Sequence, residues 1–68
     1  MDTERKQRLN AAMTALIGIK HAEVSRLSGY MISPETVSNI RRQKVKRIPL
    51  TTIIALETAV VTLARRAA

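Results

Sequence analysis

The sequence predicts an all-α domain, a compact bundle of four helices or of five, that occupies residues 1–68 as one unit. Apolar residues recur with helical spacing in several segments, and no segment shows the alternation typical of a strand. The 68 residues are too few for a second core, and no cysteine is present to form disulfides or thiolate zinc sites. Helix packing must therefore stabilise the fold. Such a unit suits both a free-standing protein and the amino-terminal domain of a longer one.

The first helix is expected from Thr3 to Ile17. Apolar side chains at Leu9, Met13 and Leu16 follow the i, i+4, i+7 spacing that lines one face of a helix. Gly18 suits the left-handed conformation that commonly ends a helix. We therefore expect the chain to turn at this glycine.

Two shorter helices are expected next. The second runs from Ala22 to Ser28 and stops at Gly29. The third has the clearest start, because Ser33 is a good N-cap and Pro34 suits the first helical position. It should fade near Arg42 or the following glutamine.

A basic loop and a long helix complete the chain. Five cations lie between residues 41 and 47 with one apolar residue among them, which predicts neither helix nor strand. Pro49 at the first helical position then opens a fourth helix, from Leu50 to about Arg66. Arg65 and Arg66 suit the negative end of its dipole.

Charge and motifs narrow the function. Twelve Lys and Arg against five Asp and Glu give a net charge of +7, which favours a polyanionic partner. The segment His21-Ala22-Glu23 matches the first part of a zinc deaminase signature, but no cysteine exists to complete the metal site. Two glycines cannot form a phosphate-binding loop. We expect no catalytic residues, metal, cofactor or small-molecule substrate, and hence no enzyme.

A membrane protein is not expected either. The apolar stretch over residues 48–64 is shorter than the ~20 residues that a span requires, and it carries Glu57. The amino-terminal segment lacks the pattern of a secretory leader, since Asp2 and Glu4 precede its basic residues and offset their charge. The sequence therefore predicts a cytoplasmic protein.

Residues 24–40 carry a recognisable motif. V-S-R-L-S-G from Val24, followed by I-S-P-E-T-V-S-N-I ending at Ile40, resembles the helix-turn-helix of lambda-repressor-like and lac-repressor-like DNA-binding domains. The Pro49-led helix with I-A-L-E resembles the helix that follows the recognition helix in the phage-repressor (Cro-type) group, so the resemblance covers His21 to Leu63. It implies a single helix-turn-helix domain whose recognition helix, residues 33–42, enters the major groove of double-stranded DNA. It also implies a bacterial transcriptional regulator of phage or plasmid type, including plasmid maintenance, at the nucleoid or a plasmid.

The chain departs from this pattern at two places. Ser25 stands where the family commonly has Ala, a mild change because Ser is small enough to let the second and third helices approach. The turn is two residues longer, because Tyr30 and Met31 intervene before the apolar residue and Ser that usually follow the turn Gly. The longer turn bears on the angle at which the third helix enters a groove, and Tyr30 is expected to cover it.

The third helix presents polar residues outward when Val37 and Ile40 face inward. Those outward positions, which by resemblance are the usual base readers, are Glu35, Ser38, Asn39 and Arg42. Asn39 suits adenine and Arg42 suits guanine, whereas Glu35 either accepts from cytosine or only complements the helix dipole. Phosphate contacts, with a solvated basic loop as the alternative, are expected from His21, Ser33, Thr36, Arg41, Lys44, Lys46 and Arg47.

A second hypothesis is a basic helical interaction module, antitoxin-like or at a membrane surface, that binds a protein or lipid partner. A membrane helix would place cations along its polar face, whereas the fourth helix carries threonines there and the cations cluster around the third helix. This distribution favours DNA. Three further cations, Arg5, Lys6 and Arg8, start the first helix, where they either face an anion or are tolerated at small cost.

The fourth helix is apolar over a wider arc than one core requires. Its second apolar stripe is a candidate homodimer face, consisting of Leu50, Ile54, Val61 and Ala64. Glu57 interrupts this stripe and needs a cation, for which Arg65 or Arg66 of the partner is the candidate. Alternatively, the stripe packs under the first helix and the basic loop, or it is merely solvated.

Overall fold

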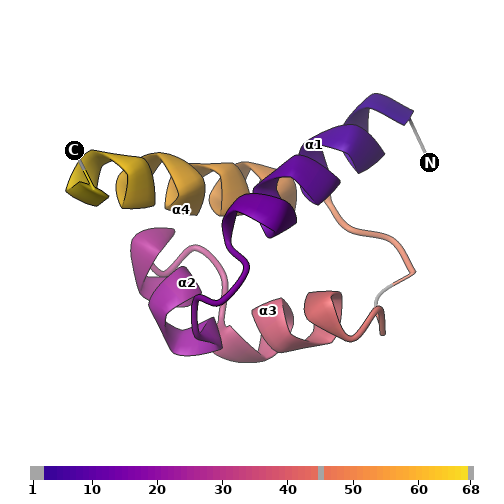
Figure 1. The fold of residues 1–68 in the computed structure, drawn as a ribbon. Coiled ribbons are helices and arrows are strands. Elements are labelled where there is room, and N and C mark those ends of the chain that lie inside the picture. Colours follow the sequence, from indigo (N-terminus) through magenta and orange to yellow (C-terminus); the bar gives the residue numbers. More distant parts are fainter. Residues whose placement is uncertain (1–2, 45, 68) are drawn as a thin grey trace.

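Four helices and no strand make up the part of the chain that the computed structural model describes, residues 3–44 and 46–67 (Figure 1). They are α1 (Thr3–Ala15), α2 (His21–Leu27), α3 (Pro34–Arg41) and α4 (Leu50–Ala67). The predicted compact all-α class is confirmed, with four helices rather than five among these residues. The molecule measures 34 × 23 × 19 Å.

The first two helices end at the predicted glycines, with small shifts. α1 stops at Ala15 rather than Ile17, and the chain continues as a turn that closes at Gly18, whose φ is +85°. α2 begins one residue earlier than predicted, at His21, and ends at Leu27. Gly29, with φ of +73°, takes the left-handed conformation expected of it.

The start of α3 follows the predicted cap. The Ser33 hydroxyl accepts a hydrogen bond from the Thr36 amide at 3.2 Å, and Pro34 is the first helical residue. The start of α4 differs by one position. Pro49 precedes the first helical residue and its carbonyl accepts from the amides of Thr52 and Ile53, so the proline occupies the N-cap rather than N1.

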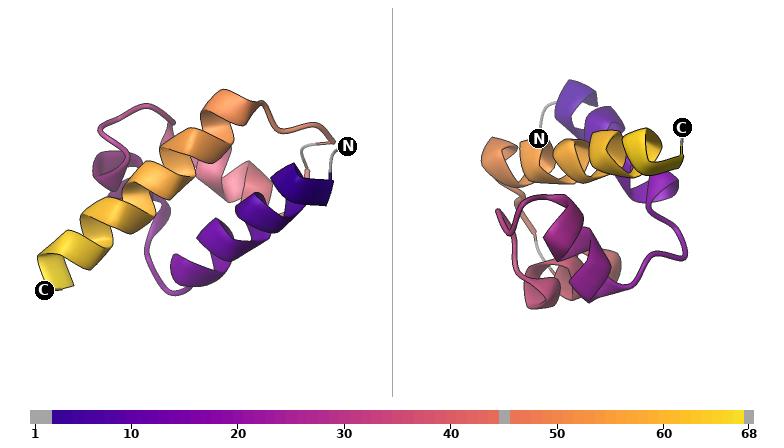
Figure 2. Two further views of the ribbon diagram at one scale, coloured as in Figure 1. Left: turned by 90° about the horizontal axis from the view of Figure 1, so that it is seen from above. Right: turned by 90° about the vertical axis from the view of Figure 1, so that its left-hand side faces the viewer.

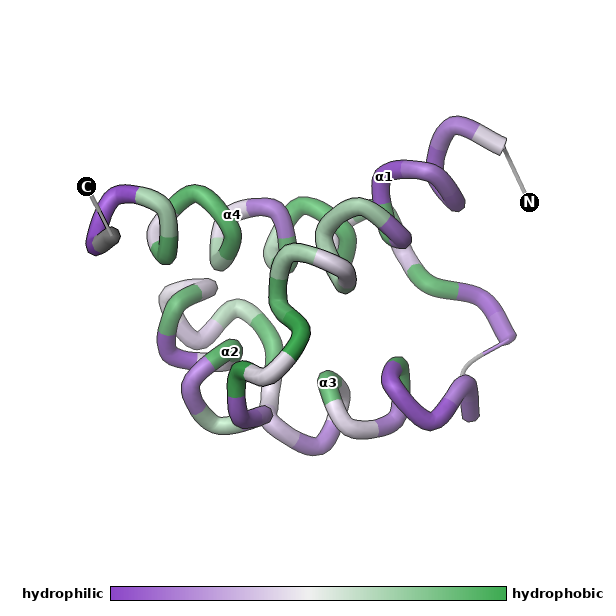
Figure 3. The backbone as a smooth tube through the Cα atoms, viewed as in Figure 1, coloured by the Kyte–Doolittle hydropathy of each residue, from purple (hydrophilic) through white to green (hydrophobic). Residues whose placement is uncertain are grey.

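The core lies between two pairs of helices. α1 and α4 lie side by side (Figure 2), and α2 and α3 lie together on the other side of the molecule. Five side chains in the centre are at most 1% exposed, namely Leu16, Val24, Val37, Ile53 and Leu56. Ala55 and Ala59 are buried as well, and their small size lets neighbouring helices approach α4 closely. Figure 3 shows the most hydrophilic stretches at the start of α1 and after α3.

Ion pairs join the elements around this core. Arg8 on α1 donates to both carboxylate oxygens of Glu57 on α4, with Nε–Oε2 at 3.0 Å and Nη2–Oε1 at 2.5 Å. This hydrogen bonding lowers the pKa of Glu57 below its usual value of 4.5. The expectation that Glu57 needs a cation from a partner subunit is therefore wrong, and Arg66 instead pairs with Glu23 of α2 at 3.1 Å.

The second apolar stripe of α4 is not covered by the rest of the chain. Ile54 and Val61 are 42% and 50% exposed, Ala64 is exposed, and Leu50 is partly buried. The alternative in which this stripe packs under α1 and the basic loop is therefore wrong. None of the described helices combines the length and apolar character that crossing a membrane requires.

Candidate nucleic-acid interface

α3 presents a polar face away from the core. Val37 and Ile40 are buried against the neighbouring helices, as the sequence predicts. The opposite face carries the four predicted base readers, of which Glu35 and Arg42 are exposed and Ser38 and Asn39 are half-buried. Within the described residues, none of these four side chains makes a hydrogen bond or an ion pair. Their polar groups are therefore free to bind a ligand.

The amino-terminal end of α3 holds two hydroxyl groups close together. The Ser33 and Thr36 hydroxyl oxygens are 2.9 Å apart, and the Ser33 oxygen also accepts the Thr36 amide. One hydroxyl hydrogen lies between the two oxygens, so the other remains available to an external acceptor. Ser33 thus caps the helix and can still take part in a phosphate contact.

His21 begins α2 with its side chain exposed. Its Nδ1 lies 3.0 Å from Nη1 of Arg41. Because a guanidinium nitrogen is always a donor, Nδ1 is the acceptor and the neutral ring carries its hydrogen on Nε2. That Nε2–H has no partner among the described residues, which suits a donor to phosphate.

Arg41 has a different environment from the one expected. Its Nη1 donates to the Ile19 carbonyl at 2.6 Å and its Nη2 to the Leu16 carbonyl at 2.7 Å. Both carbonyls belong to the turn between α1 and α2, where the Leu16 carbonyl also accepts the Ile19 amide at 3.1 Å, so the guanidinium adds a second donor to this turn from α3. We therefore leave Arg41 out of the proposed phosphate contacts and assign it to holding α3 against this turn.

The chain after α3 keeps its cations in solvent. Gln43 adopts a φ of +57°, and the Lys44 amide donates to the Asn39 carbonyl at 3.0 Å, which ends the helix. The exposed cations that follow Arg41 are Arg42, Lys44, Lys46 and Arg47. In the part of the chain that is described, none of them pairs with a carboxylate, since the three ion pairs present involve Arg8, Arg26 and Arg66.

The longer turn between α2 and α3 is held by serine hydroxyls. Ser25 is 3% exposed, and its hydroxyl donates to the Ile32 carbonyl at 2.6 Å. The Ser28 hydroxyl donates to the Ser25 carbonyl at the same distance. The Ser25 hydroxyl thus fastens the longer turn to α2, a contact that Ala could not make. The substitution of Ser for the usual Ala was the sequence signal for this contact.

Tyr30 does not cover the turn as expected. It is 74% exposed and adopts a φ of +61°, directly after the left-handed Gly29. A bulky residue rarely adopts this conformation, so the backbone here is strained. The neighbouring Met31 is also exposed, whereas Ile32 is buried and anchors the end of the turn.

No protein-family model, curated protein or solved structure matches this chain. Among the described residues, no group of three or more His, Asp or Glu side chains is placed to hold a metal ion. The geometry and charge of α3 and of the segments beside it are therefore the features that indicate a function.

Proposed function

We propose that the protein binds double-stranded DNA sequence-specifically, with α3 in the major groove. The observation that carries the proposal is the outward face of α3, where four polar side chains have no partner among the described residues. A helix about 10–12 Å across fits a major groove about 12 Å wide. α3 lies on the side of the molecule away from α4, which leaves it accessible to a duplex (Figure 1).

Each outward side chain has a chemical match on a base edge. Asn39 pairs with N6 and N7 of adenine, and Arg42 with O6 and N7 of guanine. Glu35 accepts from N4 of cytosine, and Ser38 hydrogen-bonds either kind of edge. The carboxylate of Glu35 also repels phosphate, which disfavours binding to a duplex that lacks the matching base.

Phosphate contacts surround this face. The proposed donors are His21, Ser33, Thr36, Lys44, Lys46 and Arg47. These donors and α3 together are typical of a small transcriptional regulator of phage or plasmid type, or of a DNA-binding protein of plasmid maintenance. We propose that the protein acts in the cytoplasm. The net charge of +7 supports the same partner.

A second copy of the chain is the proposed partner of the exposed stripe on α4. Leu50, Ile54, Val61 and Ala64 continue along one side of the helix, and pairing two such stripes about a two-fold axis would give two α3 helices for a palindromic site. The stripe is a single helix face, smaller than the ~800 Å² per partner of a standard interface. We therefore expect a weak dimer that DNA reinforces.

Binding selection from a random pool of duplexes tests the DNA proposal and gives the site, its symmetry and its spacing. On the selected site, Asn39→Ala and Arg42→Ala should each cost about 1–3 kcal/mol and relax preference at one base position. Lys44→Ala and Lys46→Ala should weaken all duplexes equally and reduce the salt slope by about 1 each. Equal losses on specific and random DNA for Asn39→Ala would refute the groove assignment.

Two further measurements complete the test. Lys44, Lys46 and Arg47 alone imply a slope near −3 in a plot of log binding constant against log salt concentration. A binding constant that does not change with salt would refute the phosphate contacts. Sedimentation with and without Val61→Glu tests the dimer, with Thr51→Glu on another exposed side of α4 as the control. The dimer proposal is refuted if the parent stays monomeric at high concentration and on DNA, and if Val61→Glu leaves DNA binding intact. The protein would then bind direct repeats as monomers.

A further inference from the structure

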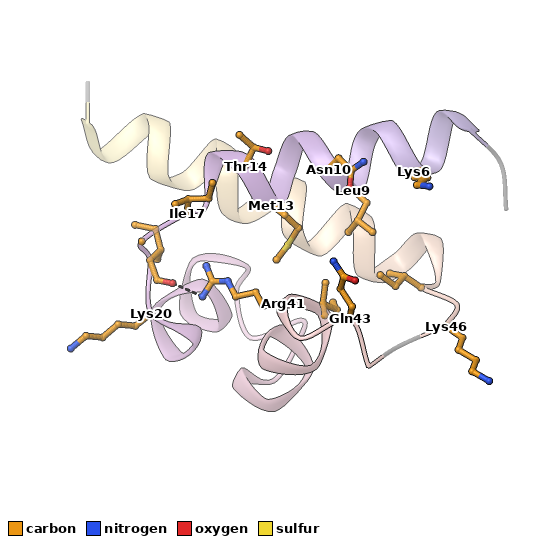
Figure 4. Close-up of a pocket in the computed structure, with 14 residues that line it drawn as sticks. Lys6, Leu9, Asn10, Met13, Thr14, Ile17, Lys20, Arg41, Gln43 and Lys46 are labelled. Carbon is orange, nitrogen blue, oxygen red and sulfur yellow. Dashed lines mark hydrogen bonds between the residues drawn. The ribbon is translucent and has the colours of Figure 1, made fainter.

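An open groove of about 1020 Å³ lies between α1 and the chain that follows α3 (Figure 4). Its apolar lining comes from three places in the sequence: the inner face of α1, the turn after it, and both ends of the basic loop. The residues that supply it are Leu9, Met13, Ile17, Ile19, Ile40 and Ile48. Segments that are distant in sequence therefore line the groove together, and it is not a packing gap between two helices.

The polar side chains of the described residues that line the groove are all basic or neutral. Lys20 stands at one end, and Lys6 and Lys46 stand at the other (Figure 4). Arg41 lies between them on the opposite wall from α1. The described residues that line the groove include no Asp or Glu, so an occupant that carries carboxylates at both ends would meet opposite charge at each.

Arg41 retains hydrogen-bonding capacity toward the groove. Of its five N–H groups, two on Nη1 face the Ile19 carbonyl and His21 Nδ1, and one on Nη2 faces the Leu16 carbonyl. The Nε–H and the second Nη2–H have no acceptor among the described residues. Since Arg41 lines the groove, these two N–H groups are the ones that could donate to an occupant.

Ile17 is the most exposed large apolar side chain of the described residues, at 75%. It lies on the rim, in the turn after α1, where Arg41 holds the backbone on either side of it through the Leu16 and Ile19 carbonyls. A rigidly held apolar side chain beside a partly apolar groove enlarges the surface that an apolar partner can cover.

The dimensions and charges indicate what kind of partner fits. α1 lines the groove from Lys6 to Thr14, about 12 Å at 1.5 Å per residue, and the turn to Lys20 lengthens it. Two turns of a helix span about 11 Å, so a partner helix of two to three turns fits the lengthened groove. A single fatty-acid carboxylate would use the cations at one end only, whereas the cations here stand at both ends.

A second copy of this chain does not suit the groove. The exposed apolar stripe of α4 has one carboxylate, Glu57, which Arg8 already holds. Arg65, exposed near the end of that stripe, would face the cations of the groove. The occupant must bring free acidic residues, which the α4 stripe does not have.

We propose that the groove binds an acidic amphipathic helix of a partner protein. Apolar side chains of that helix at i, i+3 or i+4, and i+7 cover Leu9, Met13 and Ile17, and its flanking Asp or Glu residues meet Lys6 and Lys20. The proposal does not rest on DNA binding, because only Lys46 serves in both sites. A failure of one proposal is thus distinguishable from a failure of the other.

The probe is a labelled helical peptide of about 15 residues, roughly four turns, with Leu along one face and Glu on both flanks. Its control has Gln in place of every Glu. Fluorescence anisotropy should show at least about tenfold tighter binding of the Glu peptide at low salt. In NMR spectra of the full chain, amide signals over residues 6–20 and 43–48 should shift, while those on the exposed side of α4 should not.

Substitutions at exposed positions test the contacts without disturbing the core. Ile17→Asn and Lys6→Glu should each weaken the Glu peptide by about tenfold. Arg65→Glu makes the same change in net charge outside the groove and should alter affinity less than about twofold. Equal effects of Lys6→Glu and Arg65→Glu would reduce the binding to net charge and overturn the proposal. Equal affinity of the Gln peptide, or shifts of these amides by palmitate and not by the peptide, would also overturn it.

Discussion

Removal of the Arg41 guanidinium should destabilise the fold, because this group ties α3 to the turn between α1 and α2. Its hydrogen bonds to the Leu16 and Ile19 carbonyls, at 2.7 and 2.6 Å, span 25 and 22 residues of sequence. Arg41→Ala would leave both carbonyls without this donor. The adjacent Arg42 is exposed and has no partner among the described residues, so Arg42→Ala is a matched control.

The expected loss follows from the two bonds. A hydrogen bond to a charged group contributes about 1.5–3 kcal/mol, and the lower value applies because Arg41 is half-buried and water can replace part of each contact. Two bonds give about 3 kcal/mol. A domain of this size has roughly 3–10 kcal/mol in total, so the loss is a large share of it. The melting temperature should fall by about 12–24 °C at 4–8 °C per kcal/mol.

Thermal and urea unfolding followed by circular dichroism measure this loss. Arg41→Lys should recover about half of it, since an ammonium group can reach one carbonyl but cannot span both as the planar guanidinium does. Arg42→Ala should change stability by less than about 0.5 kcal/mol, as is usual at an exposed site. A loss below that amount for Arg41→Ala, or equal destabilisation by the two alanine substitutions, would contradict the role assigned to Arg41.

Other substitutions test the turn and the ion pairs. Ser25→Ala removes the donor to the Ile32 carbonyl and should cost about 1–3 kcal/mol in urea unfolding; an unchanged midpoint would contradict the proposed fastening. Tyr30→Gly should raise the melting temperature, since Gly adopts a positive φ without strain, whereas Met31→Gly, at a position without a positive φ, should lower it. The lowered pKa of Glu57 contributes stability above pH 4.5 that is lost as pH falls through the folded-state pKa. A plot of melting temperature against pH, from about pH 6 to pH 3, should therefore be flatter for Glu57→Gln than for the parent, and parallel plots would contradict this contribution.

The helices were predictable because their ends are specified locally. Gly29 and the Ser33-Pro34 pair act through backbone conformation and a cap within one turn, and the structure places them as the sequence indicates. The end of α1 was predicted two residues too late, because the sequence over residues 16–18 suits both a last helical turn and the tighter turn that is present. Arg41, a residue distant in sequence, binds the carbonyls of the tighter turn and so favours it.

Part of the candidate site was likewise predictable from the sequence, and part was not. The outward face of α3 follows from the helical period once Val37 and Ile40 are buried. The position of Arg41 contained a signal as well, since it is four residues after Val37 and adjacent to Ile40, beside the buried face rather than opposite it. A run of cations conceals this difference, because charge alone does not distinguish the arginine that turns inward from the one that remains in solvent.

The placement of the acidic residues explains how a small domain concentrates its charge. Glu57 binds Arg8, and Glu23 binds both Arg26 and Arg66, so these pairs neutralise cations on α1, α2 and α4. None of them involves α3 or the segment after it. The excess positive charge of the described residues is therefore largest where the polar face of α3 meets the basic loop. An anionic duplex approaching from solution would be steered to that side of the molecule, and Glu35 is the one acidic side chain of α3 that it would meet there.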